Sequence, residues 1–99
     1  MLTKNEARRY LNDVSQEQSF WVNNGNVLKN LEDLANALPE MGKDTFQHHV
    51  NKEKNDFSNW IGDVIGDKVL ANDLRSSKSK ESALNKLRSR LISLKKKSA

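Results

Sequence analysis

The residues best suited to do chemistry in this chain lie between Thr45 and Asp67. This stretch contains both histidines, His48 and His49, together with four of the 13 acidic residues. Histidine and carboxylate side chains are common zinc ligands and common general acids and bases. The sequence therefore raises the question whether this stretch forms a metal site, an acid–base pair or only part of a helical core.

The spacing of the candidate ligands disfavours a metal site. Neighbouring residues on a helix point about 100° apart, so His48 and His49 do not easily share one metal ion. A helical zinc pair prefers two histidines four residues apart, and Glu53 occupies that position after His49. His49, Glu53 and Asp56 would converge only if the chain bent between them, and no third histidine or cysteine exists. We expect no metal and no other cofactor.

Acid–base catalysis would rest on Asp56, Asp63 and Asp67. A catalytic pair needs two groups in different environments. Asp56 and Asp67 each stand where a helix is predicted to begin, so N-capping explains both, and Asp63 lies on the polar side of a predicted helix. No nucleophile-elbow motif and no clustered glycine loop accompanies them. We predict a non-enzymatic protein without a small-molecule substrate.

The apolar residues of the stretch have helical spacing, which favours a structural role. One predicted helix is capped by Asp56 and ends at Gly66, and its apolar face consists of Phe57, Trp60, Ile61, Val64 and Ile65. A shorter helix before it, capped by Asp44, places Phe46, His49 and Val50 on one face. We expect His49 to be half-buried beside Phe46 and Trp60 and to hydrogen-bond to Asp56 or Asn55, while His48 is exposed.

The remaining helices are predicted by the same spacing. Thr3 and Glu6 form a capping box that opens a helix from about Lys4 to Val14. An apolar stripe from Val27 to Leu38 predicts a second helix, capped by Asn24 or Asn26 and ended by Pro39.

Two more helices follow the central stretch. Asp67 caps a short helix that holds Val69, Leu70, Ala71 and Leu74. The last helix begins at a serine cap, Ser77 or Ser79, and its apolar seam consists of Leu84, Leu87, Leu91 and Leu94, with Ala83 and Ile92 at the edges.

Only one segment favours an extended conformation. Phe20, Trp21 and Val22 are good strand formers and precede the turn sequence NNGN. No second alternating run follows, so we expect a short extended stretch at most. Because neighbouring side chains of a strand face opposite ways, one of Phe20 and Trp21 can remain exposed.

These elements predict an all-α fold, a compact single-domain bundle of five or six mostly short helices over residues 1–99, in which residues 95–99 are expected to be the flexible end. Hydrophobic residues make up 35% of the chain and charged residues 30%. No apolar run approaches the length of about 20 residues that spans a bilayer, so no membrane role is expected. The absence of cysteine excludes disulfides and fits a reducing cytoplasm, where we expect the protein.

The sequence GNVLKNLEDLANALPEM followed by FQHHVNKEKNDFSNWIGDVIGDKVLA resembles a small archaeal and bacterial domain of unknown function. The resemblance covers about Phe20 to Ile92, and its most specific part is the Asn-Asp-Phe-x-x-Trp step at Asn55, Asp56, Phe57 and Trp60. The other matching positions are Gly25, Phe46, His49, Val50, Gly66, Asp67, Leu70 and Ala71. The resemblance implies an α-helical fold and no established activity.

Two functions are consistent with these features. The first is an interaction module that binds a protein partner or a second copy, favoured by the leucine seam and by Phe20 and Trp21. The second is nucleic-acid binding, because residues 76–99 carry eight basic residues and one acidic residue, while the rest of the chain is net negative. The candidate contacts of that helix are Lys86, Arg88, Arg90, Lys95, Lys96 and Lys97.

Overall fold

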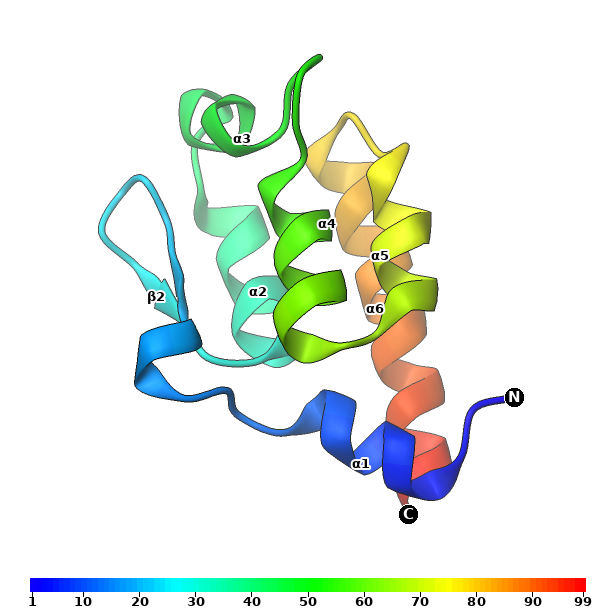
Figure 1. Cartoon of the computed structure of the whole chain (residues 1–99). Coiled ribbons are helices and arrows are strands. Elements are labelled where there is room, and N and C mark those ends of the chain that lie inside the picture. The colour runs from blue at the N-terminus through cyan, green and yellow to red at the C-terminus, as the bar shows by residue number, and fades with distance from the viewer.

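Helices dominate the chain, and a single short hairpin interrupts them. The computed structural model describes all residues, 1–99. The elements, in chain order, are α1 (Lys4–Leu11), the 3₁₀ turn η1 (Gln16–Gln18), β1 (Phe20–Trp21), β2 (Val27–Leu28), α2 (Leu31–Glu40), α3 (Lys43–His49), α4 (Asp56–Trp60), the π-helical segment η2 (Ile61–Ile65), α5 (Lys68–Arg75) and α6 (Lys80–Ser98) (Figure 1). This confirms the predicted bundle of mostly short helices.

The long helix α6 organises the bundle. It packs against α1, α2 and α5, while α4 and η2 pack against α5 (Figure 1). The apolar seam predicted for this helix is buried at Leu87, Leu91 and Leu94. The seam begins one residue earlier than predicted, because Ala83 lies in the core and Leu84 is only half-buried at its edge. No helix is both long and apolar enough to cross a membrane.

Several helix starts are those predicted from the sequence. Thr3 and Glu6 form the reciprocal capping box of α1: Thr3 Oγ1 accepts a hydrogen bond from the Glu6 amide at 3.1 Å, and Glu6 Oε1 accepts one from the Thr3 amide at 2.9 Å. Asp67 caps α5 and Ser79 caps α6. These caps work because each side-chain oxygen satisfies an amide that has no partner inside its helix.

Two other predicted N-caps are wrong. Asn30, rather than Asn24 or Asn26, caps α2, since its Oδ1 accepts the hydrogen bond of the Asp33 amide at 2.7 Å. Gly42, rather than Asp44, precedes α3, and no side chain caps that helix.

Two helix ends also differ from the prediction. α1 ends at Leu11, three residues before Val14, because the Val14 amide hydrogen-bonds to the Lys29 carbonyl at 2.7 Å instead of continuing the helix. α2 continues one residue past Pro39 to Glu40, and the Met41 amide closes its last turn. The missing N–H of Pro39 thus weakens only the final turn of α2.

The fourth predicted helix is present, but its second half is wider than an α-helix. α4 passes into η2, where the Gly66 amide hydrogen-bonds to the Ile61 carbonyl at 2.8 Å, five residues back. Gly66 has φ +95°, a left-handed conformation that a side chain disfavours, and it ends the helix as predicted.

A buried ion pair joins α6 to the start of α5. Arg90 Nε lies 2.8 Å from Asp67 Oδ2, and Arg90 Nη2 lies 2.9 Å from Asp67 Oδ1. The Asp67 side chain is only 1% exposed and the Arg90 side chain 16% exposed. These hydrogen bonds raise the pKa of Arg90 above its ordinary value, although burial opposes them. Asp67 therefore caps α5 and anchors it to α6 with the same carboxylate.

We predict that Arg90→Met destabilises the fold by about 3 kcal/mol, because it leaves the buried Asp67 carboxylate without its cation. The double variant Asp67→Ser/Arg90→Met keeps a capping hydroxyl and removes the buried charge, so it should recover most of that loss. Urea unfolding of the three proteins measures both effects. A double variant as unstable as Arg90→Met would show that the uncompensated charge is not the cause.

Candidate functional site

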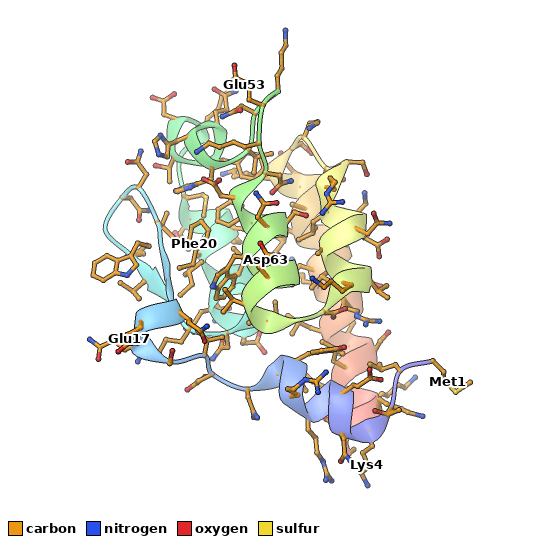
Figure 2. All side chains as sticks on the ribbon, in the orientation of Figure 1. Met1, Lys4, Glu17, Phe20, Glu53 and Asp63 are labelled. Carbon is orange, nitrogen blue, oxygen red and sulfur yellow. The ribbon has the colours of Figure 1, made fainter.

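Three aromatic rings, those of His49, Phe57 and Trp60, lie around Phe20. The ring centroid of Phe20 lies 5.0 Å from that of His49, 4.9 Å from that of Phe57 and 5.7 Å from that of Trp60. Phe20 therefore lies between the hairpin and the helices (Figure 2). Aromatic pairs at these separations contribute about 0.5–1.5 kcal/mol each beyond their buried area. Phe20 is the contact through which the hairpin docks on α3 and α4.

Trp60 is buried, as predicted, and it also makes a polar contact. The residue is 7% exposed, and its indole Nε1 donates a hydrogen bond to the Gln18 carbonyl at 2.9 Å. This bond spans 42 residues and holds η1, which leads into β1. The Asn-Asp-Phe-x-x-Trp step thus supports the hairpin as well as the core.

His49 connects the hairpin to α4 through both nitrogens of its ring. Its Nε2 lies 3.0 Å from the backbone amide of Asn23, and its Nδ1 lies 3.0 Å from Asp56 Oδ2. An amide can only donate, so Nε2 is the acceptor and carries no proton. Nδ1 therefore carries the ring proton and donates a hydrogen bond to Asp56 Oδ2.

The surroundings of His49 differ from those expected. The residue is 5% exposed, so it is buried rather than half-buried. The rings that lie against the His49 ring are those of Phe20, Phe57 and the neighbouring His48, rather than those of Phe46 and Trp60. The predicted hydrogen bond to Asp56 is confirmed, and His48 is exposed as predicted. The partner that sequence reasoning missed is the Asn23 amide, because a backbone group 26 residues away leaves no sequence pattern.

Asn55, not Asp56, caps α4, so the prediction for Asp56 is wrong. Asn55 Oδ1 accepts the hydrogen bond of the Ser58 amide at 3.0 Å, while its Nδ2 donates to the Leu74 carbonyl at 2.9 Å. The amide can do both because it carries an acceptor and a donor, whereas a carboxylate in this buried position would lack the donor. Asp56 is the first residue of the helix and turns toward His49 and Lys54.

Hydrogen bonds determine the pKa of Asp56. Burial by itself would raise this pKa, but hydrogen bonds from Lys54 and His49 to Oδ2 outweigh burial and hold the pKa below its ordinary value of 3.8. The ionised carboxylate is therefore the form that fits the folded state.

The predicted extended stretch is one strand of a hairpin, and its second strand was missed. Phe20 pairs with Leu28, and Trp21 pairs with Val27. Val27 and Leu28 also fit the helical spacing of the apolar stripe, so this spacing assigns them to the second predicted helix and the strand is not predicted. The loop between the strands contains Gly25 at φ +98°, a conformation suited to glycine in the NNGN turn.

The register of the hairpin leaves one aromatic side chain exposed, as expected. Residues directly opposite in an antiparallel pair share a face, so Phe20 and Leu28 face the core while Trp21 and Val27 face outward. Trp21 is 68% exposed and Val27 38% exposed. We call this pair the hairpin face.

A broad groove adjoins the hairpin face between β2 and α2. Its volume is about 590 Å³, and Val27 forms part of its lining. Its charged lining residues are Asp13, Lys29, Asp33 and Glu40, so carboxylates outnumber cations three to one. This acidic groove contrasts with the net charge of +4 of the whole chain.

The basic residues singled out on the last helix do not form one free surface. Arg90 binds Asp67, Lys95 Nζ lies 2.6 Å from Glu32 Oε1, and Lys86 Nζ donates to the Asp73 carbonyl at 3.1 Å. Three of the six candidates, Arg88, Lys96 and Lys97, are exposed without a polar partner in the chain. Residues 95–98 continue α6 as helix.

The acidic residues weighed for catalysis have separate partners. Asp56 contacts His49 and Lys54, Asp67 contacts Arg90, and the exposed Asp63 lies 4.0 Å from Lys68 Nζ. Nowhere do three or more His, Cys, Asp or Glu side chains lie close enough to hold one metal ion. His49 itself contacts the Asn23 amide of the hairpin and the Asp56 carboxylate of α4.

Fold and site together define a small helical domain whose aromatic core holds an exposed hairpin. A family model described as "Family of unknown function (DUF5752)" matches residues 13–95, and the chain belongs to this family. The match extends slightly beyond the resemblance seen in the sequence, which covered about residues 20–92. No curated protein and no solved structure matches the chain.

We predict that His49→Phe costs about 2 kcal/mol of unfolding free energy. The ring contacts can persist, but the Asn23 amide and the Asp56 carboxylate each lose a hydrogen bond. Urea unfolding measures the loss, and hydrogen exchange of the Asn23 amide locates it. If that amide exchanged at the wild-type rate, His49 would not be what holds the hairpin.

We also predict an acid-dependent loss of stability that originates at Asp56. The pKa of Asp56 is lower in the folded state than in the unfolded state. The stability that its carboxylate contributes is therefore complete at a pH above the unfolded pKa of 3.8, and it is lost as the pH falls through the lower pKa of the folded state. We therefore expect the free energy of unfolding, measured in urea from pH 6 to about pH 2.5, to fall more steeply below about pH 4 for the wild type than for Asp56→Asn. Parallel curves would assign the acid sensitivity to other carboxylates.

Proposed function

We propose that this protein is a non-enzymatic interaction module that binds a protein partner through the hairpin face of Trp21 and Val27. The observation that carries the proposal is the exposure of Trp21, which is 68% in a chain that has only six aromatic residues. An exposed tryptophan keeps a large apolar surface in water, and tryptophan is enriched among the residues that dominate binding energies.

The anchoring of the hairpin supports this proposal. Phe20 lies in the aromatic cluster, and the Asn23 amide is held by His49, so the backbone on both sides of Trp21 is fixed. A side chain presented on an ordered backbone loses less conformational entropy when a partner binds. The aromatic cluster and His49 thus support the proposal that Trp21 is held ready to contact a partner.

The acidic groove favours a partner segment rich in lysine or arginine. Asp13, Asp33 and Glu40 line it beside Val27, which lies opposite Trp21 in the hairpin. An indole face attracts cations within about 6 Å, and neighbouring carboxylates add charge complementarity at the rim. A basic partner segment would satisfy both features at once.

Nucleic-acid binding by α6 has less support. Arg90, Lys95 and Lys86 are engaged within the chain, so Arg88, Lys96 and Lys97 remain for phosphates. Affinity for a phosphate backbone rises with the number of neutralised phosphates, and three cations are a small set.

We predict that Trp21→Ala lowers the affinity for a basic peptide by more than tenfold, since a central tryptophan in an interface contributes about 2 kcal/mol or more. The probe is a panel of ten-residue peptides that are lysine- and arginine-rich, neutral or acidic, and the readout is the set of backbone amide resonances of the hairpin, residues 20–28, which the wild type and both variants retain. Trp21→Ala should change the free energy of unfolding by no more than about 0.5 kcal/mol, because the side chain lies in solvent.

Ile92→Ala is the matched control, because Ile92 is 64% exposed on α6, outside the hairpin. This variant should bind the basic peptides like the wild type. Equal losses in both variants, or equal binding of acidic and basic peptides, would contradict the proposed surface.

A further inference from the structure

A second concavity, unrelated to the hairpin, collects positive charge at the end of the molecule opposite both termini. The loop of residues 51–54, where Glu53 is placed, and the loop that joins α5 to α6 both lie at that end of the molecule (Figures 1 and 2). Residues of both loops line the concavity. Lys52, Lys54, Arg75 and Lys78 line this volume of about 280 Å³. We call it the basic pocket.

Three of these four cations have no counterion in the chain. Lys54 binds Asp56, but none of the five ion pairs involves Lys52, Arg75 or Lys78. Arg88, Lys96 and Lys97 of α6 also lack a carboxylate partner, but in the basic pocket three such cations line one concavity. Like charges around one pocket repel each other, and a bound anion would relieve that repulsion.

The two loops are held together before any ligand binds. The buried side chain of Asn55 ties the loop that carries Lys52 to the end of α5, because its Nδ2 donates to the Leu74 carbonyl at 2.9 Å. The Asn51 amide donates to the Lys54 carbonyl at 2.9 Å and closes the tip of the first loop. The Ser77 amide donates to the Leu74 carbonyl at 2.9 Å and fixes the second. Preorganisation of this kind lowers the cost of binding.

The lining of the basic pocket selects a polar anion. No apolar side chain lines it, Asn59 contributes an amide, and Glu53 is its one carboxylate. A phosphoryl group carries a charge of about −1.5 to −2 at pH 7 and offers three strong acceptor oxygens. The guanidinium of Arg75 can bind two such oxygens at once, and the lysines supply further positive charge.

We propose that the basic pocket binds a phosphoryl oxyanion, supplied by a phosphomonoester or by a nucleic-acid backbone. Asn59 and Arg75 also line an adjoining pocket of about 360 Å³ that contains Lys68 and Asn72, which leaves room for the rest of the ligand. Neither pocket is lined by an aromatic side chain, so bases are not stacked there and the phosphoryl group is the recognised part.

The test is a titration followed in ¹H–¹⁵N spectra at constant ionic strength, with inorganic phosphate in one arm and a 12-nucleotide single-stranded DNA in the other. The reporters are the backbone amides of residues 51–54 and the side-chain amide of Asn59. Arg75→Gln/Lys78→Gln removes two free cations of the basic pocket. Arg88→Gln/Lys97→Gln removes two exposed cations of α6 and is the charge-matched control.

We expect saturable shifts of the reporters in the wild type, at least tenfold weaker binding in Arg75→Gln/Lys78→Gln and unchanged binding in the control. Saturation by phosphate but not by DNA identifies a phosphomonoester, and tighter binding of DNA that the pocket variant weakens identifies a nucleic-acid backbone. The proposal is overturned if neither probe saturates, or if both double variants weaken binding equally. Trp21→Ala should leave phosphate binding unchanged, which separates this site from the hairpin face.

Discussion

The docking of Phe20 among His49, Phe57 and Trp60 is the contact on which the arrangement of the N-terminal half depends. The ring centroids of His49, Phe57 and Trp60 lie 4.9–5.7 Å from that of Phe20, and these contacts hold the hairpin against α3 and α4. Once Phe20 faces inward, the alternation of a strand requires Trp21 to face outward. The same contact therefore closes the core on one side of β1 and creates the candidate partner surface on the other.

Buried polar side chains add hydrogen bonds that join the hairpin and the helices to one another. His49 carries one hydrogen bond to the hairpin and one to Asp56, Asn55 joins α4 to the end of α5, and Asp67 joins α5 to α6. Every buried side-chain nitrogen and oxygen has a hydrogen-bond partner. A chain of this size has a small core, and specific polar contacts of this kind determine how short helices are placed where apolar area alone would allow several packings.

The distribution of charged side chains over the surface does not follow their distribution along the sequence. The last quarter of the sequence is strongly basic, yet Arg90 and Lys95 of α6 neutralise Asp67 and Glu32 in other helices. Cations without a carboxylate partner also line one concavity at Lys52, Arg75 and Lys78, which come from the loop of residues 51–54, the end of α5 and the loop after it, while the groove beside the hairpin is acidic. The fold thus separates an acidic surface from a basic one, and the two surfaces suit different ligands.

The sequence by itself determined the helical class, most of the apolar faces and several caps, including Thr3, Asp67 and Ser79, because these depend on residues a few positions apart. It also indicated that Phe20 and Trp21 face opposite ways. Only the tertiary structure decided that Val27 and Leu28 form a strand, that Asn55 rather than Asp56 caps α4, and that His49 holds the Asn23 amide. Each of these depends on a partner distant in the chain, and such partners compete with local preferences without leaving a periodic signal. The neutralisation of Arg90 and Lys95 was undecided for the same reason, since a charge pattern does not record which carboxylate the fold brings beside it.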